Sequence, residues 1–434
     1  MTDAAISTPA SVAPTSVKAA VESRLKARYA VERRFRWYGR FAILTALAFL
    51  AVLLTSVIAQ GASTFWTHSI AVQVRLDPAR IDRSDLESAN YNVLVADSLV
   101  AKFGLRDDDF GTVSEGMREL VSSAIGDEVF ERVRANPGLI GSTISVRGPV
   151  SDDADLYLKG QVDRSRPEAE RKLSNQQLTW LDRLRAEGAV TGGFNTRFFT
   201  RSDSTEPEQA GVLGAVVGST LMLIVTAGLS VPIGVMAAIY LEEFAPRNRF
   251  TDLIEVNINN LAAVPSIVYG LLGLALFINW LGLPRSTPIV GGLVLALMAL
   301  PTVIIATRSS LKAVPPSIRE AALGVGASRT QAVFQHVLPL AMPGVLTGTI
   351  IALAHALGET APLLMIGMVA FNPGVPASFA DSASVLPVQV FIWENASERA
   401  FHERTAAAIL VLLAFMIAMN MTAIVLRRRF ERRW

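Results

Sequence analysis

The chain contains a series of long apolar runs that are free of Asp, Glu, Lys and Arg. A helix needs about 20 apolar residues to cross a hydrocarbon core of about 30 Å. Six candidate spans have this length: they lie at 41–60, within 209–241, within 256–284, at 288–306, within 341–369 and at 405–426. The pattern predicts an all-α polytopic membrane protein with six transmembrane helices.

The composition supports this fold class. Of the 434 residues, 51% are hydrophobic and 18% are charged, whereas charged residues make up about a quarter of a typical globular protein. This composition excludes an ordinary soluble enzyme. The chain has no cysteine, which also excludes disulfides, cysteine metal sites and thiol catalysis.

A polar segment separates the first two spans. Between Ala62 and Glu208 there are 18 basic and 24 acidic residues. The alternating sequence AVQVRL favours a strand, and the stretches 114–135 and 168–190 have helical periodicity. We expect an insertion with its own core, either α+β or mostly helical. It would be a docking surface, a sensor or a decoration without chemistry.

The basic residues indicate the topology, because cytoplasmic flanks carry an excess of Lys and Arg. Residues 18–40 contain eight basic residues, and 427–434 contain five. The 308–339 loop has four basic residues and one acid, whereas 371–404 has two basic residues and four acids. We therefore expect both termini and the 308–339 loop to be cytoplasmic.

These patterns together predict the domain organisation. The parts are a basic cytoplasmic tail at 1–40, span 1 at 41–60, an extracytoplasmic insertion at 61–208, a five-span core at 209–427 that includes a loop at 308–340, and a basic cytoplasmic tail at 428–434. Span 1 could instead be a cleaved signal peptide with VIAQGAS as its cleavage site. We expect a retained anchor, because its apolar run is longer than a typical signal core.

The loop at 308–340 encodes short helices rather than a polar linker. Pro315 and Pro316 favour a helix start, and Glu320 follows in the first turn, where the helix dipole stabilises an acid. Gly324 and Gly326 then break the segment. The spaced residues of this motif are Glu320, Ala321, Ala322, Gly326, Leu338 and Pro339.

This motif resembles the cytoplasmic coupling loop of ABC-importer permeases, although His336 stands where that family usually has an apolar residue. The resemblance implies a type I permease fold and a short helix that seats in a groove of a separate ATPase. Small Ala and Gly side chains permit such close approach. The chain contains no G-x-x-x-x-G-K-[ST] sequence, so the ATPase must be a partner.

A second motif lies in span 5. Glu359 is the only formally charged residue between Thr330 and Ala380, and an ionisable group within a span is costly and often functional. Gly358 and Pro362 flank it and favour a kinked or locally open helix.

The string GETAPLL, with the sequence FNTRFFTRSDSTEPEQAG before span 2, resembles phosphate-specific ABC-importer permeases. The resemblance covers 194–434 and implies that Glu359, His355, Thr360 and Arg308 lie along the translocation pathway. That family commonly has an Arg four residues before the Glu, where this sequence has His355.

The roles of these pathway residues have alternatives. Glu359 could accept hydrogen bonds from protonated phosphate, or it could be a clamp that pairs with Arg or His on a neighbouring helix. His355 could be a switch near its ordinary pKa or a packed, satisfied side chain. Arg308 could meet the anion at the exit or be a positive-inside anchor. Gly214 with Gly218, and Gly344 with Gly348, permit close helix crossings.

The resemblance implies a permease subunit that imports inorganic phosphate by alternating access. Its implied partners are a related permease subunit, an ATPase dimer, an extracytoplasmic phosphate-binding protein and membrane lipid. We expect no catalytic residue, cofactor, metal or nucleic-acid partner. The alternatives are a permease for another solute such as sulfate or molybdate, a membrane sensor with an extracytoplasmic input domain, and a secondary transporter.

Overall fold

The computed structural model describes residues 17–105 and 112–430 of the chain. It divides into two compact units, 1–57 and 58–434. Within the first unit, the described residues belong to the long helix α1 (Val17–Gly61), whose last residues enter the second unit. Its stretch from Arg28 is long and apolar enough to cross a membrane.

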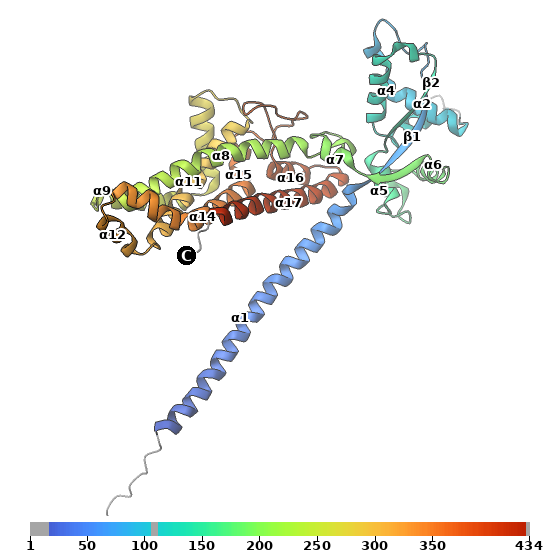
Figure 1. Cartoon of the computed structure of the whole chain (residues 1–434). Helices are drawn as coiled ribbons and strands as arrows, with labels where there is room; N and C mark the ends of the chain where they lie inside the picture. Colours follow the sequence, from blue (N-terminus) through green and yellow to red (C-terminus); the bar gives the residue numbers. More distant parts are fainter. Residues whose placement is uncertain (1–16, 106–111, 431–434) are drawn as a thin grey trace, which may run out of the picture. The chain divides into compact units, whose positions relative to one another are not determined.

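The insertion is an α+β domain, which decides between the two folds that the sequence left open. Its three strands form an antiparallel sheet in the order β2-β1-β3 (Figure 1). The elements are β1 (Trp66–Arg75), α2 (Tyr91–Phe103), α3 (Thr112–Arg118), α4 (Ala124–Ala135), β2 (Thr143–Pro149), α5 (Asp152–Leu158), α6 (Asn175–Ala186), β3 (Val190–Phe194) and α7 (Thr196–Thr200).

The sheet has one buried and one open face, as period-2 alternation requires. In β1, Ile70, Val72 and Val74 are buried, whereas the residues between them are at least partly exposed. The buried face packs on apolar residues of the helices, including Leu99 and Leu181. A single continuous core therefore stabilises this domain.

Helices dominate the rest of the chain. Among the described residues, five helices are long and apolar enough to span a membrane; α1 is one of them, the other four lie in this part of the chain, and a bent pair here would make a sixth span. The elements are α8 (Leu213–Ile239), α9 (Arg249–Ala262), α10 (Ser266–Gly273), α11 (Pro288–Lys312), α12 (Pro316–Gly324), α13 (Arg329–Gln331), α14 (Leu338–Gly358), α15 (Ala361–Met365), α16 (Leu386–Glu394) and α17 (Arg399–Phe430).

The third predicted span differs from a simple helix. It is broken between α9 and α10, which meet at an angle of 99°. The break is at Pro265, which has no N–H to continue the hydrogen-bond ladder and lies directly before α10. In the described part of the chain, π-helical turns adjoin three of the apolar helices: η6 (Tyr240–Phe244) follows α8, η7 (Leu274–Trp280) follows α10, and η8 (Ala332–Val337) leads into α14.

α11 packs against both α8 and α14, and α14 packs against α17 (Figure 1). Gly344 and Gly348 permit the contact between α11 and α14. A β-carbon at Gly344 would collide with Ser310 of α11, and one at Gly348 would collide with Ala306 of α11. Gly214 and Gly218 behave differently from the expectation, since they lie against the chain at Ser202, Gly374 and Ser384 rather than against a helix.

Candidate functional site

The predicted coupling motif lies on and around α12. Glu320 and Ala321 are exposed, whereas Ala322 is buried. Gly326 has a φ of +91° and ends the segment in the left-handed region, which a residue with a side chain rarely adopts. Leu338 and Ile318 of α12 pack against the same apolar cluster, so α12 and the end of the motif adjoin one core.

The exposed surface of α12 is apolar at its far end. Leu323 is 49% exposed and Val325 is 87% exposed. A β-carbon at Gly324 or Gly326 would meet no atom within 4 Å. This small, partly apolar surface leaves room for another protein to approach the backbone of the loop.

An arginine that the sequence reasoning missed holds this helix in place. Arg319 donates to Glu243 of η6 at 2.6 Å and to the backbone carbonyls of Leu311 at 2.9 Å and Val314 at 2.8 Å. The Glu243 side chain is only 8% exposed. A charge-assisted pair of this kind is strong, so movement of α12 would be transmitted to the end of α8.

Arg308 is also held by acids. Its guanidinium contacts Glu255 of α9 and lies 3.4 Å from Glu242 of η6. Lys312 lies 3.6 Å from the same Glu242. The Arg308 side chain is 13% exposed. Two carboxylates, those of Glu242 and Glu255, balance the charge of its guanidinium. Neither role expected for Arg308 from the sequence, contact with the anion or membrane anchoring, includes this cluster of acids.

Glu359 follows the last residue of α14 and precedes the short helix α15. The helix is open at this point, as the flanking Gly358 and Pro362 suggested. Pro362 packs directly on Gly270 of α10, where a β-carbon would lie 2.6 Å from the Pro362 Cα. The Glu359 side chain is 20% exposed, and Thr360 is also partly exposed.

His355 is the partner of Glu359. Its Nε2 lies 3.3 Å from Oε1 of Glu359, four residues further along the chain. Within this chain the His355 side chain is 67% exposed. Ile351, one turn earlier, is 60% exposed. The pair therefore lies on an open face of α14.

A third polar cluster, not expected from the sequence, joins the insertion to α17. Asp155 binds His68 at 2.8 Å and Lys159 at 2.7 Å, and Lys159 lies 3.6 Å from Glu403. Burial alone would raise the pKa of Asp155, but its hydrogen bond with His68 and the charge of Lys159 lower it below the usual value. This ionised network fixes α5 to the beginning of α17.

Glu208 in the turn before α8 has the opposite environment. Burial raises its pKa to about 7, and repulsion from Glu206 and Asp152 adds to this effect. Within the described residues, no group of three or more His, Cys, Asp or Glu side chains is arranged to hold a metal ion.

Comparison with known proteins gives two family matches along the chain. Residues 22–168 match a domain of unknown function, DUF3333. Residues 230–434 match the binding-protein-dependent transport system inner membrane component. Among solved structures, the MetNI methionine ABC transporter in an inward-facing conformation is 18% identical, with a TM-score of 0.42, over 50% of this chain and 94% of that chain.

Curated relatives match up to about half of the chain. The probable ABC transporter permease protein YqgI of Bacillus subtilis is 34% identical over 39% of this chain and 57% of its own length. Phosphate transport system permease protein PstA 1 of Mycobacterium tuberculosis is 33% identical over 51% of this chain and 72% of its own length. PstA of Haemophilus influenzae is 30% identical over 51% of this chain and 77% of its own length. The chain is a multi-pass inner-membrane protein and belongs to the family of phosphate transport system permease proteins, PstA.

Proposed function

We propose that this chain is the permease subunit of an ATP-driven importer that carries inorganic phosphate across the cytoplasmic membrane. The observation that carries this proposal is its identity of 33% to a PstA protein over 72% of that relative's length. GETAPLL, which first suggested phosphate, lies at the break between α14 and α15. The chain itself makes and breaks no covalent bond.

The coupling surface supports a separate ATPase as the partner. Glu320, Ala321 and the two glycines of the loop are exposed, whereas Arg319 fixes the same helix to Glu243. An ATPase dimer (PstB-like) that binds this loop could therefore pull on η6 and α8. Closing and opening of the ATPase pair would drive the alternating access of the spans.

The open face of α14 supports a second permease subunit as a partner. His355 is 67% exposed and Ile351 is 60% exposed on this face. An ionisable pair facing lipid is costly, so we infer that a related, PstC-like subunit covers it. The phosphate pathway would then lie between the two subunits, with Glu359, His355 and Thr360 on its wall.

The pathway roles follow from this placement. Glu359 accepts a hydrogen bond from protonated phosphate when His355 releases it, and His355 supplies a cationic partner when protonated. Arg308 remains bound to Glu242 and Glu255 and stabilises the end of the bundle at which the coupling loop lies.

The topology and domain division remain those inferred from the charges. Both termini and the 308–340 loop would lie in the cytoplasm, and the insertion at 61–208 would lie outside, where a phosphate-binding protein (PstS-like) delivers the anion. The core at 209–427 contains the spans that change orientation during transport.

Uptake of radiolabelled phosphate at micromolar concentration tests the substrate. In cells that have no other phosphate system, deletion of the gene should abolish uptake, and restoring it should recover uptake that excess sulfate or molybdate does not reduce. Uptake that is unchanged by the deletion would overturn the assignment of phosphate. Uptake that is suppressed by sulfate would indicate a broader oxyanion permease.

A variant of the coupling loop tests the ATPase contact. Glu320→Lys, or a bulky residue at Gly326, should abolish transport without preventing membrane insertion. Glu87→Lys makes the same charge change at an exposed acid in the insertion and should leave transport unchanged. Normal transport by the Glu320→Lys protein would mean that the ATPase binds elsewhere.

A further inference from the structure

A pocket of about 300 Å³ lies on the insertion domain, away from the coupling loop and from Glu359. It is formed by the ends of the three strands and the start of α7. Thr67 and Ser69 of β1 point to the open face of the sheet, since the alternate residues Ile70 and Val72 are buried in the core. The pocket thus lies over the polar face of the sheet.

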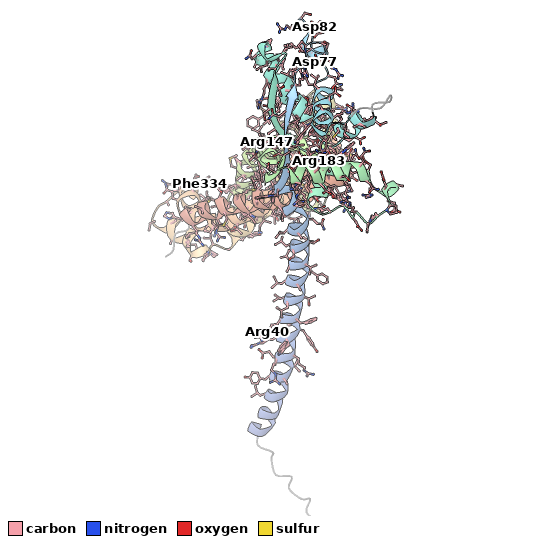
Figure 2. The ribbon with its side chains drawn as sticks, turned by 90° about the vertical axis from the view of Figure 1, so that its right-hand side faces the viewer. Arg40, Asp77, Asp82, Arg147, Arg183 and Phe334 are labelled. Carbon is pink, nitrogen blue, oxygen red and sulfur yellow. The ribbon has the colours of Figure 1, made fainter. Side chains whose placement is uncertain are left out.

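Two arginines line this pocket. Arg147 belongs to β2, where it is paired in register with Ala71 and so shares the open face with Ser69 (Figure 2). Arg197 belongs to α7 and is partly buried. Within 17–105 and 112–430, neither guanidinium has an ion-pair partner. No carboxylate is among the residues that line the pocket.

The charge of Arg197 is poorly compensated. Burial lowers the pKa of its guanidinium, and repulsion from Arg201 lowers it further, whereas Glu128 has an opposing attraction. Glu128 is bound to Arg132 at 2.8 Å. Arg197 nevertheless stays charged at neutral pH, so an anion in the pocket would relieve an existing electrostatic cost.

The remaining polar groups suit a tetrahedral oxyanion. The pocket is lined by the hydroxyl groups of Thr67, Ser69, Thr191 and Thr196. Hydroxyl groups can donate to oxyanion oxygens. The planar guanidinium of an arginine can donate two parallel hydrogen bonds to two oxygens of one phosphate. His68, which lines the pocket, binds Asp155, and this acid is also bound by Lys159.

A glycine of strand β3, Gly193, keeps the pocket open. Gly193 is paired in register with Thr67 and so lies on the same face of the sheet. A β-carbon at this position would meet no atom within 4 Å. A large side chain at this position would therefore extend over the pocket without colliding with neighbouring protein atoms.

We propose that this pocket binds a phosphate-type oxyanion through Arg147, Arg197 and the surrounding hydroxyl groups. The ligand is either free inorganic phosphate or the phosphate of a lipid headgroup. The location of the pocket is compatible with both ligands. Trp66 and Phe194, at the edge of the sheet beside the pocket, are each 56% exposed and adjoin the segments that lead to the spans. The inference does not require phosphate to be the transported solute.

The test uses the purified full-length chain in lipid-free detergent and measures two ligands separately. Equilibrium dialysis with radiolabelled inorganic phosphate measures the free anion. Native mass spectrometry with added phosphatidylglycerol measures the lipid. We expect Arg147→Gln with Arg197→Gln to weaken binding of one of the two ligands by at least about tenfold, because hydrogen bonds to charged groups contribute about 1.5 to 3 kcal/mol.

Two further variants control this result. Arg183→Gln removes the same charge from an exposed arginine on α6 (Figure 2), which does not line the pocket, and should bind both ligands like the wild type. Gly193→Leu keeps both arginines but should block the pocket and weaken binding to a similar extent. This second variant decides the question if the double arginine variant has a lower melting temperature.

Each outcome has a defined meaning. Loss of inorganic phosphate binding assigns the pocket to the free anion, and loss of phosphatidylglycerol alone assigns it to a lipid headgroup. Binding of both ligands that is unchanged in the double variant and in Gly193→Leu would overturn the proposal. Binding that falls equally in Arg183→Gln would also overturn it, since the effect would then be one of net charge.

Discussion

The insertion domain and the helical bundle bury their apolar side chains in different ways. The insertion has one continuous core that includes Ile70, Leu99 and Leu181. The bundle has several smaller clusters and leaves apolar residues such as Phe250 and Ile351 more than half exposed. The domain therefore has a core of its own, whereas the bundle leaves an apolar surface that lipid or another protein can cover.

Their charged residues differ in the same sense. Ion pairs of the insertion are mostly exposed, such as Arg132 with Glu128. Several of those in the bundle are more buried and join separate elements, as Arg319 does with Glu243. Exposed pairs contribute little to stability, so the core is decisive in the insertion, whereas partly buried pairs such as Arg319 with Glu243 matter more in the bundle.

The largest expected effect tests the core of the insertion. Leu181 is fully buried, and Leu181→Ala should destabilise the domain by about 3 to 5 kcal/mol, through lost burial and the cavity that remains. Limited proteolysis of the full-length protein should then cleave within the insertion while the membrane helices stay intact. If cleavage increased equally in both regions, the two would fold as one unit.

A smaller effect is expected in the bundle. Gly348→Leu places a side chain against Ala306 of α11 and should destabilise the α11–α14 contact by roughly 3 kcal/mol, since overpacking forces helices apart. The melting temperature in detergent measures this. Gly228→Leu is the matched control, because nothing lies within 4 Å of a β-carbon there. Equal melting temperatures of the two variants would contradict the close crossing.

The boundary between the two regions should respond to pH. The pKa of Glu208 is about 7 in the folded protein, above the ordinary value of 4.5 for a glutamate. The folded state thus binds more protons in this range, so stability falls as pH rises from about 4.5 to about 7. Glu208→Gln should remove this decline with pH. Melting temperatures between pH 5 and pH 8 measure it, with Glu87→Gln as the exposed control.

The smallest effect is expected for an exposed ion pair of the insertion. Arg132→Ala removes a pair in which both side chains are more than 40% exposed and should cost less than about 1 kcal/mol. Chemical denaturation, monitored by tryptophan fluorescence, gives the free energy of unfolding of this variant for comparison with that of Leu181→Ala. A cost as large as that of the core variant would mean that the charged surface of the insertion is part of its stability.

Local patterns predicted much of the architecture. Apolar runs gave the positions of the spans, and Gly358 with Pro362 indicated the break beside Glu359. The strand β1 followed from its alternation. These features depend on neighbours in the sequence, which is why they can be seen without the structure.

Contacts between distant residues could not be predicted in this way. Arg319 lies 76 residues from Glu243, and the sequence contains many acids that could have served as its partner. The same limit applies to Arg308 with Glu255 and to His68 with Asp155. The bend at Pro265 was a local signal, but it lies in an apolar run of the right length for one straight span.

The pairing of Trp66 with Phe194 has a consequence for how such proteins arise. The first and last strands of the insertion are neighbours, so the chain leaves and returns at points about 5 Å apart. A single genetic event could add or remove the whole domain and leave the adjoining helices in register.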